Sequence, residues 1–252
     1  MQQTPTEHHV PSVDVVIPVY NEEHVLERSV ITLRDFLRAQ IPYEWRILIA
    51  DNASTDRTLE VAKGLAARYP DDVAYLHLPQ KGRGRALRTA WMASDADILS
   101  YMDVDLSTGL EAFPPLVQAI AVEGYDLATG SRLMQRSHIV RSLKREILSR
   151  GYFLMIQALF GVHFTDAQCG FKALSRQAAR ALLPLVQNQE WFFDTELFVL
   201  AEKNGYRIKD VPIRWIEDPD SRVNIPKTIA EDVRGLLRLR FHLPRVQPPA
   251  RD

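Results

Sequence analysis

The sequence predicts an α/β protein in which helices flank a mostly parallel sheet. Four short β-rich runs alternate with helical patterns in the first half of the chain, as in strand–helix–strand units. Crossovers of this kind are right-handed and leave the strands parallel. The 252 residues are 46% hydrophobic and 25% charged, which suits a globular protein of one large domain.

The elements follow one another regularly along this half. Residues 13–19 (VDVVIPV) read as a buried strand because they are almost entirely apolar and β-branched. Four apolar residues then recur on one face of a helix: Leu26, Val30, Leu33 and Leu37. By the same criteria, further strands are predicted at residues 46–50, 73–78 and 97–102, and further helices at about 58–67 and 86–93.

The two ends of the chain and its second half show less pattern. Residues 1–12 are polar and contain two prolines, so we expect a flexible arm, and residues 246–252 form a short tail. The longest apolar stretch of the second half, residues 151–165, holds 15 residues, whereas a membrane-spanning helix needs about 20. We therefore expect a single domain over residues 13–245 without transmembrane helices.

Charge is unevenly distributed, although the formal net charge is only −1. Residues 132–150 contain six basic residues and one acidic residue, and residues 227–245 contain five and two. Two basic segments on an acidic body indicate an anionic partner, either a phosphate group or a membrane surface. A nucleic-acid partner is disfavoured, because no DNA- or RNA-binding module is visible.

Polar clusters follow all four predicted strands. They are PVYNEE at 18–23, DNASTD at 51–56, KGRGRALR at 81–88 and DVDLS at 103–107. Ligands of parallel α/β sheets bind beyond the carboxyl ends of the strands, so these clusters are candidate binding loops. Plainer alternatives stay open, because Asn21 and Ser54 could cap helices and the glycine–arginine loop could be a solvated turn.

Asp103 and Asp105 stand one residue apart just beyond the fourth predicted strand. Two carboxylates at that spacing repel each other unless a cation lies between them. Mg²⁺ and Mn²⁺ prefer oxygen ligands and bridge carboxylates to phosphates. We therefore predict a divalent-metal site at these aspartates. A D-x-D pair also occurs by chance in surface turns, and the glycine–arginine loop nearby is what favours the metal.

These motifs, in this order, resemble the nucleotide-sugar domain of family-2 inverting glycosyltransferases, which have the GT-A fold with a Rossmann-like sheet. Later segments resemble the dolichyl-phosphate β-glucosyltransferase branch, a relative of dolichyl-phosphate mannose synthase. These segments are DAQCGFK at 166–172, WFFDTEL at 191–197, VPIRW at 211–215 and DSRV at 220–223. The resemblance covers residues 13–242, and implies a nucleotide-sugar half at 13–107 and an acceptor half at 108–245.

The resemblance assigns the donor site to the first half. Five residues would hold the base and ribose: Pro18, Tyr20, Glu22, Asp51 and Ser54. A carboxylate among them can accept the N–H groups of uracil or guanine. Lys81, Gly82 and Arg85 would lie near the donor. Asp103 and Asp105 would hold the metal, with Asp105 as a direct ligand.

The resemblance assigns a lipid phosphate to the second half. Arg132, Arg145 and Ser149 match the residues that hold this phosphate in mannose synthases, and the last two lie on one face if they are helical. The arginine fork matches phosphate geometry better than a lysine does. The apolar residues 151–165 could accept a lipid chain or rest on a bilayer. A solvated basic face is the plainer alternative.

One position departs from the pattern. Mannose synthases carry Gln two residues after the second aspartate, whereas this chain has Ser107, which is shorter and favours glucose over mannose. Cys169 has no evident base and is expected to be a buried small residue rather than a nucleophile. Asp194 would act as a general base only if the acceptor were a hydroxyl group.

The resemblance implies transfer of a hexose, most favourably glucose from UDP-glucose, to a polyprenyl (dolichyl-type) phosphate. The reaction would invert the anomeric centre and give a β-linked product. Such an enzyme would bind peripherally to the cytoplasmic face of a membrane. The alternatives are a GDP-mannose-dependent mannose synthase and a non-catalytic sugar-nucleotide-binding module. A pyrophosphorylase is disfavoured, because its glycine-rich signature should stand where PVYNEE does.

Overall fold

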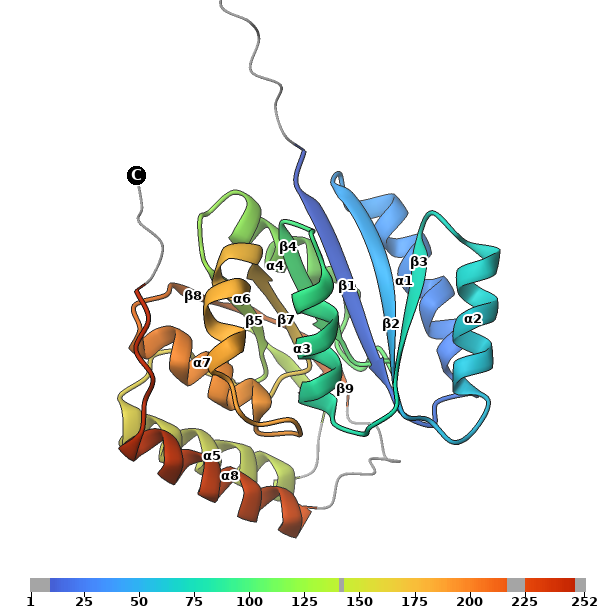
Figure 1. Cartoon of the computed structure of the whole chain (residues 1–252). Helices are drawn as coiled ribbons and strands as arrows, with labels where there is room; N and C mark the ends of the chain where they lie inside the picture. Colours follow the sequence, from blue (N-terminus) through green and yellow to red (C-terminus); the bar gives the residue numbers. More distant parts are fainter. Residues whose placement is uncertain (1–9, 141–142, 217–224, 248–252) are drawn as a thin grey trace, which may run out of the picture.

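The computed structural model of the chain describes residues 10–140, 143–216 and 225–247, so residues 1–9 of the predicted arm and the DSRV segment at 220–223 lie outside it. Seven strands form one sheet in the order β3-β2-β1-β4-β7-β5-β8 (Figure 1). They are β1 (Ser12–Val19), β2 (Glu44–Asn52), β3 (Val73–Leu78), β4 (Ile98–Met102), β5 (Leu127–Ser131), β7 (Phe171–Ser175) and β8 (Ile208–Pro212). Only β7 runs antiparallel to its neighbours among these strands, so the sheet is mostly parallel, as predicted.

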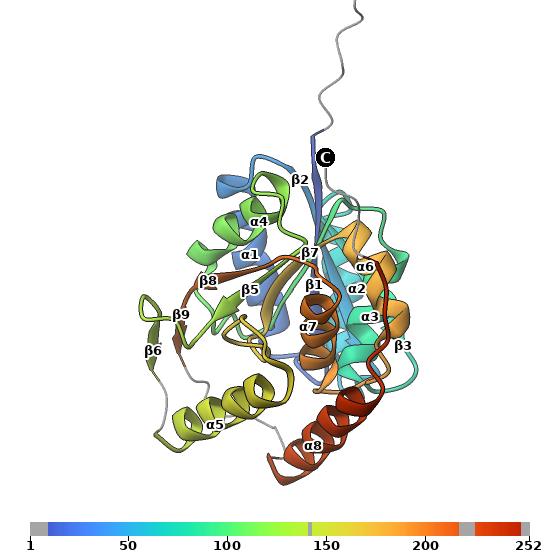
Figure 2. The ribbon, with the colours of Figure 1, turned by 90° about the vertical axis from the view of Figure 1, so that its left-hand side faces the viewer.

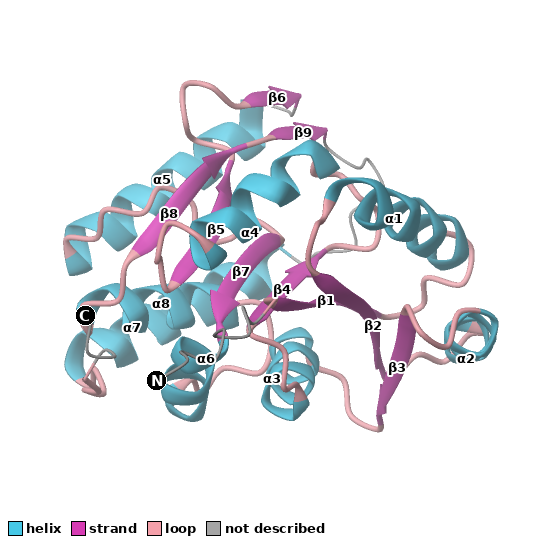
Figure 3. Cartoon of the chain, turned by 90° about the horizontal axis from the view of Figure 1, so that it is seen from above, coloured by secondary structure: helices cyan, strands magenta, loops and turns pink. Residues whose placement is uncertain are grey.

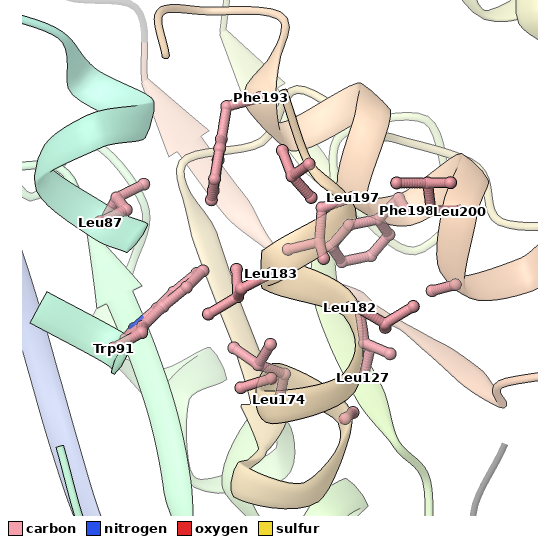
Figure 4. Close-up of a cluster of buried hydrophobic side chains, with 14 of the residues drawn as sticks. Leu87, Trp91, Leu127, Leu174, Leu182, Leu183, Phe193, Leu197, Phe198 and Leu200 are labelled. Carbon is pink, nitrogen blue, oxygen red and sulfur yellow. The ribbon is translucent and has the colours of Figure 1, made fainter. Parts of the chain in front are cut away.

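Helices cover both faces of the sheet, as Figure 3 shows from above. One face carries α1 (Leu26–Gln40), α2 (Thr58–Arg68) and α4 (Phe113–Ala121), and the other carries α3 (Arg83–Ala93), α6 (Arg176–Leu182) and α7 (Phe193–Lys203). Val15 and Ile17 of β1 belong to the first core, whereas Val16 belongs to the second. Figure 4 shows part of this second core, where Trp91 of α3 faces Phe193 of α7. Burial on both faces explains the continuous apolar runs of the central strands.

Two helices lie outside these layers, at one end of the molecule. They are α5 (Leu143–Phe160) and α8 (Ile225–Phe241), which lie next to each other in Figures 1 and 2. A small parallel sheet of β6 (His138–Val140) and β9 (Arg214–Ile216) lies near α5. Within the described residues, no helix is both long and apolar enough to cross a bilayer.

The predicted strands and helices of the first half are confirmed, with β2 two residues longer at each end than predicted and one larger difference at the start of α3. Helix α3 begins at Arg83 rather than near Ala86, so the glycine–arginine run forms its first turn. Gly82 precedes this turn with φ of 155°, which favours glycine. A Cβ on Gly84 would lie 2.6 Å from Phe193 Cβ, so this glycine lets α3 approach α7. The sequence suggested a loop here because glycine is a poor helix former.

Candidate active site

The carboxyl ends of β1, β2 and β4 meet at one edge of the sheet. The strand order reverses between β1 and β4, because β2 and β3 extend from the opposite side of β1. Ligands of such sheets bind in the crevice at this reversal. Each of these strands is followed by a non-glycine residue with positive φ: Asn21, Ala53 and Leu106. Strained backbone of this kind concentrates at binding sites.

Side-chain hydrogen bonds join the loops after β1 and β2. The Asn21 amide N–H donates to Ser54 Oγ at 3.0 Å, and the Thr55 amide donates back to Asn21 Oδ1 at 2.8 Å. The Glu22 amide donates to Thr58 Oγ1 at 2.8 Å. Neither α1 nor α2 has a side-chain cap, so the capping role considered for Asn21 and Ser54 is wrong. The two loops are instead joined to each other at the carboxyl ends of β1 and β2.

Other residues predicted to contact the donor lie near these two joined loops. Asp51 is buried, and its Oδ2 lies 2.6 Å from His77 Nδ1. The Lys81 ammonium lies 3.5 Å from the centre of the Tyr20 ring, a close cation–π contact between two predicted residues. Pro18 lies inside β1, before the strand ends. The structure therefore brings Tyr20, Asp51 and Lys81 to the same edge of the sheet.

A buried ion-pair network begins at the first turn of α3. Arg83 Nη2 donates to Asp103 Oδ1 at 2.7 Å, and Arg83 Nη1 donates to Asp194 Oδ2 at 2.8 Å. Tyr101 Oη donates to the same Asp194 oxygen at 2.8 Å, and Lys172 Nζ lies 3.6 Å from the other. Burial alone would lower the pKa of the Arg83 guanidinium, but the surrounding carboxylates raise that pKa well above its usual value. Arg83 therefore stays charged and links α3, β4 and α7.

Sequence reasoning missed Arg83, because it favoured Lys81 and Arg85 from the same motif. Arg85 is half-buried and donates to the Lys81 carbonyl. The signal that could have identified Arg83 is the spacing of residues along one face of a helix. A helix that starts at Arg83 places it on the same buried face as Leu87 and Trp91, four and eight residues further on.

Asp103 and Asp105 occupy the turn after β4. The Asp103 side chain is 42% exposed, and Asp105 is exposed with its Oδ1 accepting the Ser107 amide N–H at 3.0 Å. A Cβ on Gly170 would lie 1.8 Å from Asp103 Oδ2, so the glycine leaves the space that this carboxylate occupies. No third His, Cys, Asp or Glu joins a metal cluster within the described residues. Two carboxylates fit a hard cation that takes its remaining ligands from phosphates and water.

A small pocket, about the size of a water molecule, lies beyond β5 and against α5. It brings together Arg132 and Ser149, two of the predicted acceptor residues, with Tyr152 beside them. Arg132 Nε and Nη2 donate to the two oxygens of Asp166 at 2.7 and 3.0 Å, which holds the guanidinium plane. Burial alone would raise the pKa of Asp166, but Arg132 lowers it. Arg145 lies in α5 one turn before Ser149, and its side chain is outside the described residues.

Helix α7 contacts this pocket as well as the donor site. Thr195, next to Asp194, exchanges a hydrogen bond with Tyr152 Oη of α5 at 2.9 Å. Cys169 is buried, as predicted, and burial with the nearby Asp166 charge raises its pKa to about 12. A thiol of this kind stays protonated and packs as a small apolar side chain.

Asp232 of α8 is a buried carboxylate beside this pocket. Its Oδ2 accepts a hydrogen bond from Gln168 Nε2 at 3.1 Å, and its Oδ1 has no hydrogen-bond partner among the described residues. Burial and the neighbouring charge of Glu231 raise its pKa to about 7. The carboxyl group is therefore half-protonated near neutral pH.

We expect Asp232→Asn to stabilise the protein at pH 8 and to change little at pH 4. Because its pKa is raised on folding, protonated Asp232 contributes stability that is complete below about pH 4 and lost as the pH rises to about 7. The substitution removes the free-energy cost of a buried charge, which is on the order of a few kcal/mol. In a protein of this size, each kcal/mol changes Tm by about 2–4 °C. Thermal unfolding at both pH values measures this, and equal shifts of Tm at pH 4 and pH 8 would contradict it.

A mostly parallel sheet with carboxylates and a helix start at its strand reversal is typical of the class of α/β proteins that bind phosphate-bearing nucleotides. The family model "Glycosyl transferase family 2" matches residues 14–183. The chain belongs to this family, and its fold is the GT-A fold, as the sequence motifs predicted.

Curated relatives carry two kinds of name. Glycosyltransferase AglD of Haloferax volcanii is 35% identical over 233 residues, which are 92% of this chain and 37% of that protein. Dolichyl-phosphate beta-glucosyltransferase ALG5C of Trichomonas vaginalis is 30% identical over 222 residues, which are 83% of this chain and 65% of that protein. The dolichyl-phosphate beta-glucosyltransferase of Saccharomyces cerevisiae is 27% identical, over 90% of this chain and 73% of its own. The chain thus spans only part of each relative's length.

Solved structures share the fold. Glucosyl-3-phosphoglycerate synthase from Mycobacterium tuberculosis in complex with Mn²⁺ and UDP-glucose matches with a TM-score of 0.67 at 21% identity. This match covers 93% of the present chain and 80% of that one. The same enzyme with UDP alone gives a TM-score of 0.68.

Proposed function

We propose that this domain transfers glucose from UDP-glucose to a polyprenyl phosphate of the dolichyl type. The observation that carries the proposal is the pairing of two sites, the strand reversal between β1 and β4 and the Arg132–Ser149 pocket at β5 and α5. The names of the dolichyl-phosphate β-glucosyltransferase relatives support this sugar and this acceptor. A structural neighbour that binds UDP-glucose supports the donor.

The donor nucleotide would lie along the joined loops after β1 and β2. Asp51 is oriented by His77, and among the described residues its Oδ1 accepts a long hydrogen bond of 3.4 Å from the Ser54 amide. This oxygen can accept a base N–H group in exchange. The Tyr20 ring and Lys81 would border the same nucleotide, with Lys81 toward its phosphates.

Asp103 and Asp105 would hold Mg²⁺ or Mn²⁺ together with oxygens of the donor diphosphate. Such a cation neutralises the charge that grows on the diphosphate as it leaves. The protein adds positive charge of its own to the same place. Arg83, in the first turn of α3, lies beside Asp103 at the helix end where an anion is favoured.

The acceptor phosphate would bind Arg132 and Ser149, with Arg145 one helical turn away. A phosphate oxygen is already an anion, so it can attack the anomeric carbon without a general base. A single displacement opposite the leaving diphosphate inverts an α-linked donor to a β-linked product. Asp194 is 3% exposed and held by Arg83, which suits a role in fixing Arg83 rather than in proton transfer.

The acceptor lipid would be reached from the surface of a membrane, on its cytoplasmic face. The outer sides of α5 and α8 expose large apolar residues, among them Leu154 at 60% and Phe241 at 75%. On α8 these residues recur every four positions: Ile229, Val233, Leu237 and Phe241. Exposed Arg234 and Arg240 lie on the same helix. An apolar stripe with arginines beside it is typical of a helix that lies in a bilayer interface.

A transfer assay tests the proposed function. Purified protein, MgCl₂ and a polyprenyl phosphate are given either UDP-glucose or GDP-mannose, and lipid products are identified by mass spectrometry. We expect a hexosyl phospholipid from UDP-glucose, and at least about tenfold tighter calorimetric binding of UDP than of GDP. Tighter GDP binding with mannose transfer would support the mannose synthase alternative. Nucleotide binding without any transfer would support the non-catalytic module.

Vesicle sedimentation tests the membrane proposal. We expect the protein to sediment with anionic vesicles at low salt and to be largely released at high salt, because basic residues near such a surface contribute about 1 kcal/mol each within a Debye length. Leu237→Glu should weaken this binding about tenfold or more. Val122→Glu is the matched control, since Val122 is 73% exposed at the far end of α4. Equal, salt-independent binding to neutral vesicles would contradict the electrostatic part.

A further inference from the structure

Residues 187–192, here called the strap, connect the short helix at 183–185 to α7 and pass over the first turn of α3. The Gln189 carbonyl accepts the Arg85 amide N–H at 3.0 Å. A Cβ on Gly82 would lie 2.7 Å from the same carbonyl oxygen, so strap and donor loop are in direct contact. The Trp191 ring lies 5.0 Å from the Arg83 guanidinium. The strap therefore sets the position of the turn proposed to face the donor diphosphate.

The other side of the strap contacts α8. Asn188 Nδ2 donates to Glu231 Oε1 at 2.6 Å, and Arg238 Nη1 donates to Gln187 Oε1 at 2.8 Å. A Cβ on Gly235 would lie only 2.2 Å from the Phe192 ring, so α8 packs closely against the end of the strap at this point. Movement of α8 would therefore be transmitted to the strap.

Glu196 joins these contacts. Its side chain is 1% exposed, and its oxygens accept the amide N–H groups of Gln187 at 3.1 Å and Asn188 at 2.8 Å. Arg238 Nη2 lies 2.6 Å from Glu196 Oε1 and is the cation that pairs with this carboxylate among the described residues. A buried carboxylate that loses its cation is strongly unfavourable. Arg238 thus keeps Glu196, and through it the strap, in place.

We propose that Arg238 of α8 is a positioning residue for the donor site, acting through Glu196 and the strap on the first turn of α3. Arg238 lies on the helix that carries the exposed apolar stripe, so seating of α8 and binding of the nucleotide are coupled. Coupling of this kind is reciprocal, so nucleotide also favours the seated helix. The proposal rests on the proposed function only in that the crevice binds a nucleoside diphosphate.

Calorimetric titration with UDP, without lipid and at fixed salt, tests this coupling. Arg238→Met should weaken UDP binding about tenfold. Arg240→Met removes the same charge two residues further on, from an exposed side chain without an ion pair to any described residue, and should change UDP binding less than twofold. Arg238→Lys keeps the charge opposite Glu196 but loses the bond to Gln187, so its affinity should be intermediate.

Two further measurements separate positioning from general destabilisation. Asn188→Ala removes the hydrogen bond to Glu231 without leaving a buried charge. It should weaken UDP binding about threefold and leave Tm unchanged. In the transfer assay, Arg238→Met should raise KM for the donor and leave kcat within twofold. The inference would be overturned if Arg238→Met kept the wild-type UDP affinity and donor KM. It would also be overturned if Arg238→Met and Arg240→Met weakened UDP binding equally. Either result would leave the proposed function standing. A wild-type protein that binds neither UDP nor GDP would instead overturn the proposed function.

Discussion

Asp105→Asn is expected to lower sugar transfer at least about a hundredfold, whereas Ser107→Ala should lower it less than about threefold. Losing one charged contact to a developing anion costs about 3 kcal/mol or more in the barrier. Asp105 would hold the cation that makes this contact, while the contact of Ser107 with Asp105 runs through its backbone N–H, which alanine retains. Initial rates at saturating donor and acceptor, over a range of Mg²⁺ and Mn²⁺ concentrations, measure the difference.

Chelation provides the control for this prediction. EDTA should abolish transfer by the wild-type protein, and added Mn²⁺ should restore it. Direct titration of Mn²⁺ in the presence of UDP should show one site in the wild-type protein and a much weaker one in Asp105→Asn. Full turnover in EDTA would remove the metal from the mechanism.

Arg83→Met is expected to lower the free energy of unfolding by about 3–5 kcal/mol, because it leaves the buried Asp194 without its closest cation. In a protein of this size the corresponding fall in Tm is at least about 6 °C. Arg85→Met is the matched control, since it removes the same charge two residues further on. Its side chain donates only to the Lys81 carbonyl among the described residues, and its effect on stability should stay within about 1 kcal/mol.

A second substitution tests the cause. Asp194→Asn in the Arg83→Met background should restore part of the lost stability, because it removes the carboxylate that Arg83 balances. The double variant should still bind UDP poorly, since the positive charge at the start of α3 is absent. Additive losses of Tm in the double variant would contradict the ion-pair explanation.

The parts of the site that were predictable lie close together in sequence. Asp103 and Asp105 follow a strand that its own apolar run identifies, and strand ends gather at one edge of any parallel sheet. The Arg83–Asp194 pair joins residues 111 positions apart, and no local pattern relates them. Their contact depends on β7, which enters the sheet antiparallel between β4 and β5 and brings α7 beside α3.

The strap was unpredictable for a related reason. Its contacts involve the backbone N–H of Arg85 on α3 and the side chain of Arg238 on α8, and such pairings appear only once the helices are packed. The sequence identified the basic segment that contains Arg238 as a whole. It could not distinguish the arginine that pairs with Glu196 from Arg240, which is exposed.

The first turn of α7 places three consecutive side chains on three different elements. Asp194 holds Arg83 of α3, Thr195 bonds Tyr152 of α5, and Glu196 holds the strap. A substitution at one of these three residues should therefore show strong epistasis with that residue's own distant partner on α3, on α5 or in the strap. It should show little epistasis with the partners of the other two residues. A variant library that pairs changes at 194–196 with changes in α3, α5 and α8 would trace this pattern. In such a library, the tolerated sequences of the donor and acceptor halves would depend on each other through three residues.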